Sequence, residues 1–283
     1  MHPISKILSV TKLASIQINC WGHPVTSGSK YIDYYLSSML METEESKNHY
    51  SEELILLPSI GLNYQVPKAP NDGQYLFEKF KIPRSRPLLS SMQSDFKYIP
   101  ENDSVFAEIS NKNRNALIIF VEGVGNKLIS ENLIKRISLK YKELDLNIND
   151  HVLLLPRLEH SDYIGMLKIS HHSLDTINHN GGNSSLQALS VDCPVLTYPT
   201  EFMRGRHTVG MLNEMGVTEL IATSRGNYIN ISSRLLSDLS FYLDIKGKIS
   251  QNKNKLFNNN DVSSSLKEFI ESKCFPRSVN ELN

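Results

Sequence analysis

The chain has 283 residues, of which 40% are hydrophobic and 21% are charged, so it has the composition of a globular protein with one large or two moderate domains. Lysine plus arginine and aspartate plus glutamate number 30 each, which gives no overall field favouring nucleic acid or a basic partner. The three cysteines, Cys20, Cys193 and Cys274, form no disulfide framework by number or spacing, and we expect Cys20 and Cys193 to be buried thiols. The longest purely apolar run, 116–121, is too short to cross a membrane, and the first residues lack signal-peptide character, so the predicted location is cytoplasmic.

The first part of the chain is typical of the end of an α/β unit. Alternating residues at 14–20 predict a strand, and a loop rich in turn residues follows at 22–28. Further strands are predicted at 32–36 and 50–57, and the prolines between 67 and 87 indicate a linker.

From about residue 88 the pattern alternates between strands and helices. Strands are predicted at 115–121, 151–155, 173–175, 194–198 and 217–222. Helices are predicted at 130–144 with Ser130 as cap, after Ser161 as cap, after the loop at 180–185, and at 208–215, 235–243 and 266–271. The Asn/Lys-rich stretch 251–260 is predicted to be an exposed loop. This alternation favours a doubly wound parallel sheet, whose ligands bind at the carboxyl ends of the strands, where the loops 22–28 and 180–185 would lie.

The loop 180–185, Asn-Gly-Gly-Asn-Ser-Ser, is the segment with the clearest binding character. Two glycines let the backbone approach a ligand, and Asn183, Ser184 and Ser185 are good N-cap types for the following helix. Because a helix start carries free N–H groups and partial positive charge, it suits a phosphate. A plain strand-to-helix turn with a good cap explains the same residues equally well.

Single charged residues elsewhere are ambiguous by composition alone. Lys97 and the arginines Arg204 and Arg206 read most simply as surface cations, and His160 reads as a cap or surface residue at a strand exit.

Taken in order, the motifs resemble those of the O-GlcNAc transferase/SPINDLY-like glycosyltransferases, especially the bacterial members. Gly-His-Pro-Val-Thr-Ser-Gly at 22–28 precedes Ile-Asp-Tyr, and Tyr-Ser-Glu-Glu-Leu at 50–54 precedes Leu-Pro. A lysine stands before Tyr-Ile-Pro at 97–100, and Leu-Asp-Thr at 174–176 precedes the glycine loop. Pro-Val-Leu-Thr-Tyr-Pro at 194–199 is followed by Arg-Gly-Arg.

The resemblance implies a GT-B-like α/β fold, with one complete Rossmann-like donor-binding domain at 88–283, including the C-terminal helices. Residues 1–87 would be the C-terminal remnant of the acceptor-side Rossmann-like domain plus the linker. The implied activity is metal-independent, inverting transfer of N-acetylglucosamine or another hexose from a nucleotide sugar, most simply a UDP-sugar, to a protein or glycan. No Asp-x-Asp metal motif is present, and the helix start would replace the cation, so no cofactor is expected.

The resemblance also assigns site residues. It implies catalytic roles for Lys97 and His23. It implies donor binding by Gln93, Arg157, His160, Asn180, Gly181, Gly182, Asn183, Ser184, Ser185 and Gln187. It implies an acceptor or cleft loop containing Gly22, Pro24, Thr26, Ser27 and Gly28.

The chain departs from the family pattern in two ways. Gln187 replaces an acidic residue that can contact ribose, and the His/Asn-Thr-Thr pattern is here Asn183-Ser184-Ser185. The family also has well over a hundred residues before the first loop, so we expect a truncated transferase that is weak or inactive alone. The alternatives are a non-catalytic nucleotide-binding remnant and one half of a split glycosyltransferase, whose partner would be a separately encoded N-terminal half. The expected partners are a nucleotide sugar and a protein or glycan acceptor, without nucleic acid or a membrane span.

Overall fold

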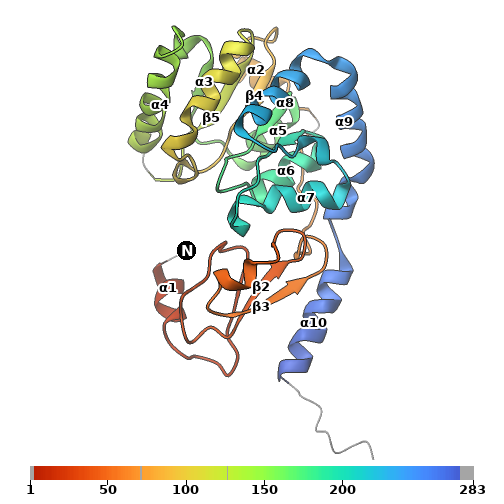
Figure 1. Ribbon diagram of the computed structural model, residues 1–283. Coiled ribbons are helices and arrows are strands. Elements are labelled where there is room, and N and C mark those ends of the chain that lie inside the picture. The colour runs from red at the N-terminus through yellow and green to blue at the C-terminus, as the bar shows by residue number, and fades with distance from the viewer. Residues whose placement is uncertain (1–2, 71, 126, 275–283) are drawn as a thin grey trace, which may run out of the picture.

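The computed structural model describes residues 3–70, 72–125 and 127–274, which form two parallel sheets with helices around them (Figure 1). The smaller sheet has the order β1-β2-β3, with β1 at Ile18–Cys20, β2 at Tyr34–Ser38 and β3 at Glu53–Leu57. Helix α1, Pro3–Ser9, precedes it, and the 3-10 turn η1, Ser46–His49, lies between β2 and β3. The three strands predicted in this part are confirmed, each with a later start than expected.

The larger sheet has the order β6-β5-β4-β7-β8, and all of its pairs are parallel. Its strands are β4 at Leu88–Ser90, β5 at Leu117–Val121, β6 at Val152–Leu155, β7 at His172–Leu174 and β8 at Val195–Leu196. Strands β5 and β6 follow β4 on one side of the sheet, and the next strands along the chain, β7 and β8, lie on the other side of β4. The order therefore reverses between β4 and β7, and that reversal opens a crevice at the carboxyl ends of these two strands.

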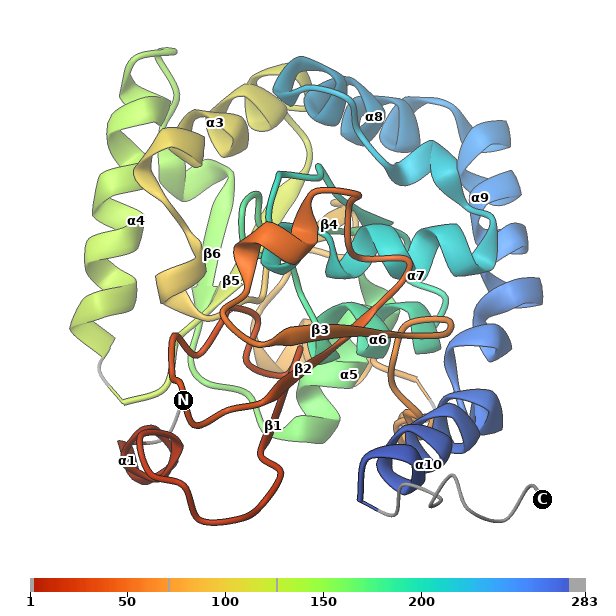
Figure 2. The same ribbon diagram turned by 60° about the horizontal axis from the view of Figure 1, so that its bottom comes forward.

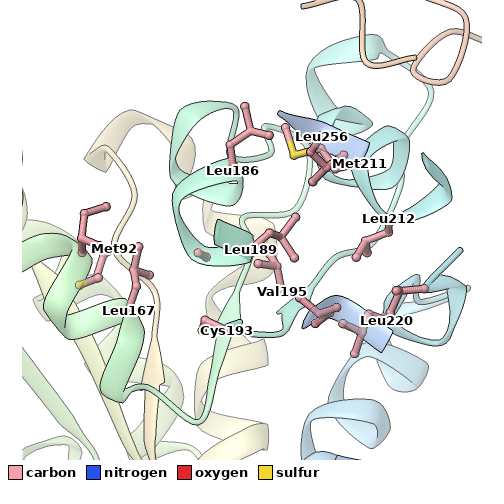
Figure 3. Close-up of a cluster of buried hydrophobic side chains, with 14 of the residues drawn as sticks. Met92, Leu167, Leu186, Leu189, Cys193, Val195, Met211, Leu212, Leu220 and Leu256 are labelled. Carbon is pink, nitrogen blue, oxygen red and sulfur yellow. The ribbon is translucent and has the colours of Figure 1, made fainter. Parts of the chain in front are cut away.

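Helices cover both faces of the larger sheet, as the doubly wound prediction requires. Alternating strand residues point to opposite sides: Leu117 and Ile119 join one buried cluster, and Ile118 and Phe120 join the other. The first cluster includes side chains of α5 (His160–Ile169), α6 (Asn183–Ser190), α7 (His207–Met215) and α9 (Leu239–Asn252), part of which Figure 3 shows. The second cluster includes side chains of α3 (Asp103–Lys112), α4 (Lys127–Lys142) and α8 (Arg225–Ser237).

Helix α7 and the last described helix connect the larger unit to the smaller sheet. Arg206, just before α7, donates from Nε to the carbonyl of Met41 at 3.0 Å, so it is not a free surface cation. Gly210 on α7 leaves room for Met41, whose Cγ would lie 2.8 Å from an added Cβ. Helix α10, Asn260–Cys274, runs beside β2 and β3, where Val262 packs with Leu36 and Leu57 (Figures 1 and 2). The division of the chain at residue 87 stays a prediction.

Several local predictions are wrong. The stretch 217–222 forms a 3-10 turn, η6 at Thr218–Leu220, and contributes only an isolated bridge from Ile221 to Thr197. The helix predicted at 235–243 is two helices, α8 and α9, separated at Asp238, whose side chain accepts a bond from the Phe241 N–H. The stretch 251–260 is no exposed loop, because α9 continues into the 3-10 turn η7, Lys253–Leu256, with Leu256 and Phe257 buried.

The predicted helix caps and one predicted thiol also need correction. Helix α5 begins at His160, one residue before Ser161. Ser130 lies inside α4, so it is not the N-cap of this helix. Its hydroxyl instead donates a hydrogen bond to Asp95 Oδ2 at 2.8 Å. Cys193 is buried as expected, but Cys20 is exposed because it ends the edge strand β1.

Short elements complete the described chain: α2 at Tyr75–Lys79 within the proline-rich segment, and the 3-10 turns η2 at Asp95–Lys97, η3 at Pro100–Asn102, η4 at Ile148–Asp150 and η5 at Met203–Gly205. In the described ranges, each helix is too short or too polar to cross a membrane.

Candidate functional site

A cavity of about 640 Å³ lies where loops of both sheets meet at the crevice beside β4 and β7. The smaller sheet contributes the loop after β1, from Trp21 to Val25. The larger unit contributes the loop after β4, the loop after β5, the exit of β6 and the loop after β7. These include Gln93, Lys97, Arg157, Asn180, Gly182, Asn183 and Ser184. The loops predicted to meet at the carboxyl ends of the strands therefore do meet.

The glycine loop places the start of α6 at the cavity, as Gly182, Asn183 and Ser184 line it. The hydrogen bonds at this helix start differ from the prediction. The cap of α6 is Gly182, which has no side chain, so Asn183, Ser184 and Ser185 do not act as N-caps. The Gly181 N–H is already used, because it donates to Asp175 Oδ1 at 2.7 Å. Within the described ranges, the N–H groups of Gly182, Asn183 and Ser184 donate to no other residue. These three N–H groups are available to an anion.

Lys97 lies against the glycine loop. Its Nζ donates to the Asn180 carbonyl at 2.7 Å and to Gln93 Oε1 at 3.2 Å, and the Ser184 hydroxyl donates to the same Gln93 oxygen at 2.9 Å. Burial lowers the pKa of Lys97, and the charge of Asp175 opposes that shift. The structure thus brings four predicted residues together, with an ammonium group next to the start of α6.

Asp175 is a residue of this site that our assignment missed. Asp175 is 4% exposed, and its carboxylate accepts hydrogen bonds from the Gly181 N–H and, at 3.0 Å, from the Thr197 hydroxyl. Burial raises the pKa of Asp175, and hydrogen bonds and Lys97 oppose the shift. Its position directly after a buried strand, within Leu-Asp-Thr, was the signal that could have identified it.

Three other predicted donor residues lie on the side of α5 and α6. Arg157 lines the cavity at the exit of β6. The Gln187 Nε2 and His160 Nε2 atoms are 3.3 Å apart, so two residues separated by a strand and a helix meet at the surface. They flank the start of α6 without lining the cavity.

The predicted acceptor loop divides into two halves. Gly22, His23 and Pro24 line the cavity. Thr26 donates to Glu52 Oε2 at 2.6 Å, and the Ser27 N–H donates to Glu52 Oε1 at 2.8 Å, so the second half is held against β3. Gly28, with φ 65°, completes the turn away from the cavity. Burial lowers the pKa of His23, and the charge of Glu52 opposes the shift.

Five aromatic residues that line the cavity were absent from our assignment: Trp21, Phe96, Tyr163, His179 and His207. His179 contacts the exposed ring of Phe96 edge-on, with centroids 5.3 Å apart. His207 begins α7 and is buried. Burial, with Lys97 and Arg204 nearby, lowers the pKa of His179 to about 4. Neither histidine stands in a sequence pattern that separates it from an ordinary buried residue.

Comparisons with known proteins agree with the motifs. Residues 128–266 match the family described as Glycosyl transferase family 41. A relative from Eustoma exaltatum subsp. russellianum, described as a probable UDP-N-acetylglucosamine–peptide N-acetylglucosaminyltransferase SPINDLY, is 26% identical over 238 residues. That match covers 80% of this chain and 24% of the relative, so the chain spans about a quarter of its length. The Arabidopsis thaliana protein of the same description is 22% identical with the same coverage.

Solved structures show the same fold. The Thermobaculum terrenum O-GlcNAc transferase, as a mutant, aligns with a TM-score of 0.74 at 21% identity, over 92% of this chain and 48% of that chain. The glycosyltransferase WaaG aligns with a TM-score of 0.57 over 87% of this chain and 64% of its own. The fold is thus α/β and GT-B-like, as the resemblance implied. The chain is therefore similar to the O-GlcNAc transferase/SPINDLY-like glycosyltransferases, and its residues 128–266 match the glycosyl transferase family 41 model.

Proposed function

We propose that this chain is the donor-binding part of a glycosyltransferase that moves a sugar from a nucleotide sugar to a protein or glycan hydroxyl. The observation that carries the proposal is the start of α6, where Gly182, Asn183 and Ser184 line the cavity and their N–H groups donate to no other described residue. The Lys97 ammonium is bonded to the Asn180 carbonyl beside them. Both features favour the negative charge of a diphosphate.

In the reaction, the bond from the sugar's anomeric carbon to the diphosphate oxygen breaks, and a bond to the acceptor oxygen forms. The leaving diphosphate gains negative charge, which the α6 start and Lys97 would stabilise without a metal or another cofactor. An inverting path brings the acceptor from the opposite side of the sugar, which we assign to the loop of Gly22 and Pro24. His23 on this loop can accept the acceptor's proton, because burial lowers its pKa and keeps the imidazole neutral near pH 7.

The remaining predicted residues would hold the nucleoside and the transferred sugar. Arg157, His160 and Gln187 flank the α6 start and offer hydrogen bonds to a base or ribose. The relatives' printed names include UDP-N-acetylglucosamine and a peptide, and we propose the same donor and acceptor classes here. The chain covers 48% of the aligned bacterial structure, and we also propose that residues beyond the given sequence, on this polypeptide or on a second one, complete the acceptor side.

Calorimetric titration of UDP and GDP into the full 283-residue chain tests the donor site. We expect one diphosphate to bind, with uridine and guanosine as controls that lack the phosphates. Absence of heat and of NMR chemical-shift changes at millimolar nucleotide would contradict the proposal. Binding without sugar transfer, both alone and with a polypeptide covering the rest of the relatives, would favour a non-catalytic nucleotide-binding protein.

A further inference from the structure

The loop that brings His23 to the cavity is anchored to the smaller sheet by a buried tyrosine. Tyr35 lies on β2, is 0% exposed, and donates from its hydroxyl to the His23 carbonyl at 2.7 Å. The Val25 N–H donates to the same carbonyl at 2.8 Å, so one oxygen both closes the turn and ties it to the sheet. The turn that presents His23 therefore depends on one side-chain hydroxyl.

Tyr35 is itself fixed by the segment Tyr-Ser-Glu at 50–52. The Tyr35 and Tyr50 ring centroids are 4.3 Å apart, and the Tyr50 hydroxyl donates to Glu42 Oε1 at 2.7 Å. Burial raises the pKa of both tyrosines, and the charge of Glu42 adds to the shift, so each hydroxyl keeps its proton and can donate. Because Tyr50 packs on the ring and Glu42 holds Tyr50, Tyr35 has little freedom to turn away from the loop.

The same segment holds the second half of the loop through Glu52. This residue is 6% exposed, and its carboxylate accepts from the Thr26 hydroxyl at 2.6 Å and from the Ser27 N–H at 2.8 Å. Burial raises the pKa of Glu52, but the hydrogen bonds from Ser27 and Thr26 outweigh burial and lower the pKa, so the carboxylate is charged at neutral pH. The charge of Glu52 also acts on His23, where it opposes the lowering of the pKa by burial.

We propose that Tyr35 and Glu52 are positioning residues that fix the loop 22–28 at two points and so hold the His23 imidazole in the cavity wall before a ligand binds. This inference rests on the proposed function, in which His23 takes the proton of the acceptor. A proton acceptor works only when its nitrogen lies within hydrogen-bond reach of the hydroxyl. A loop that is fixed at two points loses less freedom when the acceptor binds than a mobile loop does.

Y35F removes the hydroxyl that holds the first half of the loop and keeps the ring that packs on Tyr50. Amide hydrogen exchange of the full chain measures how often the loop opens. We expect the His23 and Val25 amides to exchange roughly three- to tenfold faster in Y35F, as for the loss of one hydrogen bond. We also expect an NMR titration to show the His23 pKa rising toward its usual value of about 6.5, because a released loop exposes the imidazole to water.

Y141F is the matched control. Tyr141 is also 0% exposed and donates to a backbone carbonyl, that of Phe106 at 3.1 Å, but it belongs to the core of the larger unit and is outside the cavity lining. We expect Y141F to lower the melting temperature without changing loop exchange or the His23 pKa. The inference is overturned if Y35F leaves loop exchange or the His23 pKa as in the wild type, or if Y141F changes them equally.

Two changes at Glu52 cover the case in which Y35F does not fold. E52A removes both acceptor oxygens, whereas E52Q keeps one oxygen for the Ser27 N–H and has an amide that can donate to the Thr26 hydroxyl. We expect faster exchange of the Ser27 amide in E52A, and in E52Q slow exchange with a further lowered His23 pKa, because the charge is lost. E53A, at the next residue, whose carboxylate lies near a lysine of α10, should change neither.

These measurements use no nucleotide, so their failure differs from failure of the proposed function, which absence of UDP binding by the wild type would contradict. Slow exchange of the Ser27 amide in E52A, or equally fast exchange in E52A and E52Q, would overturn the inference.

Discussion

At the scale of single residues, the buried carboxylate of Asp175 holds the glycine loop of the proposed donor site by hydrogen bonds. Asp175 accepts hydrogen bonds from the Gly181 N–H and the Thr197 hydroxyl. The nearby charge of Lys97 opposes the rise in the pKa of Asp175 that burial causes. The ammonium itself is bonded to the Asn180 carbonyl above. The loop is therefore held in shape before any ligand binds, and the N–H groups of Gly182, Asn183 and Ser184 donate to no other residue in the described part of the chain.

Replacing Lys97 with alanine tests the role of this charge. We expect K97A to weaken UDP binding by about 1.5–3 kcal/mol, as for the loss of a charge-assisted hydrogen bond, and to leave uridine binding nearly unchanged. Calorimetry with both ligands measures the difference. Equal losses for UDP and uridine would place the ammonium away from the diphosphate.

Much of the site could be predicted because apolar runs in the sequence mark the strands, and the loops that follow them form the site. Gly22 and His23 follow one predicted strand and the glycine loop follows another, and these residues line or flank the cavity. Gln93 and Lys97 also line it, but they follow β4, a strand that was not predicted. The sequence did not show which N–H of the loop is already occupied, because that depends on Asp175 folding back beneath it. His207 was equally hidden, since its place beside Trp21 depends on the packing of two separate sheets.

At the scale of elements, strands and helices with a regular pattern were predictable and packed turns were not. The apolar run of β5 and the spaced apolar residues of α4 gave correct elements. The polar stretch around η7 was misread because η7, with the buried Leu256, contacts α6, α7 and α9, and the buried Phe257 packs near Tyr64. Local composition cannot reveal these contacts. The strand expected at 217–222 formed a 3-10 turn that adds one bridge at the sheet edge.

The contact between the segment before α2 and helix α5 depends on two glycines. A Cβ added at Gly73 would clash with the backbone of Gly165 and lie 2.8 Å from Ile169 Cγ2. We expect G73A to lower the melting temperature clearly, because backbone cannot move aside as a side chain can. Thermal unfolding followed by circular dichroism measures the change.

Gly247, in the middle of α9, provides the matched control. An added Cβ there meets nothing within 4 Å, so G247A should raise stability by roughly 0.5–1 kcal/mol through its better helix propensity. If G73A were as stable as the wild type, the close approach of α5 would not be needed for the fold.

At the scale of the whole molecule, several histidines are held neutral by burial. Burial lowers the pKa of His171 to about 4 and that of His207 to about 3, and it lowers the pKa of His172 well below its usual value. In the unfolded chain each would titrate near 6.5. Between these values the unfolded state binds more protons, so stability falls as pH decreases from about 6.5.

This predicts a pH-dependent midpoint of denaturation in urea. Between about pH 6.5 and pH 5 each fully buried histidine should contribute up to about 1.4 kcal/mol per pH unit, and H207F should flatten the slope by one such contribution. Asp175, whose pKa is raised by burial, acts in the opposite direction. Carboxylates with lowered pKa values, such as Asp162, lose their stabilisation only at lower pH. If the pH dependence of stability were the same in H207F as in the wild type, the His207 imidazole would have the same pKa in the folded and unfolded states.

Helix α10 covers an apolar surface of the smaller sheet that is synthesised about 200 residues earlier in the chain. Leu36 and Leu57 belong to strands near the start of the chain, yet Val262 covers them, and Asn63 meets Ser263 across 200 residues. A ribosome releases these strands long before it makes the helix. The smaller sheet therefore leaves the ribosome with its apolar face uncovered, and its protection from other nascent chains depends on how quickly synthesis reaches α10.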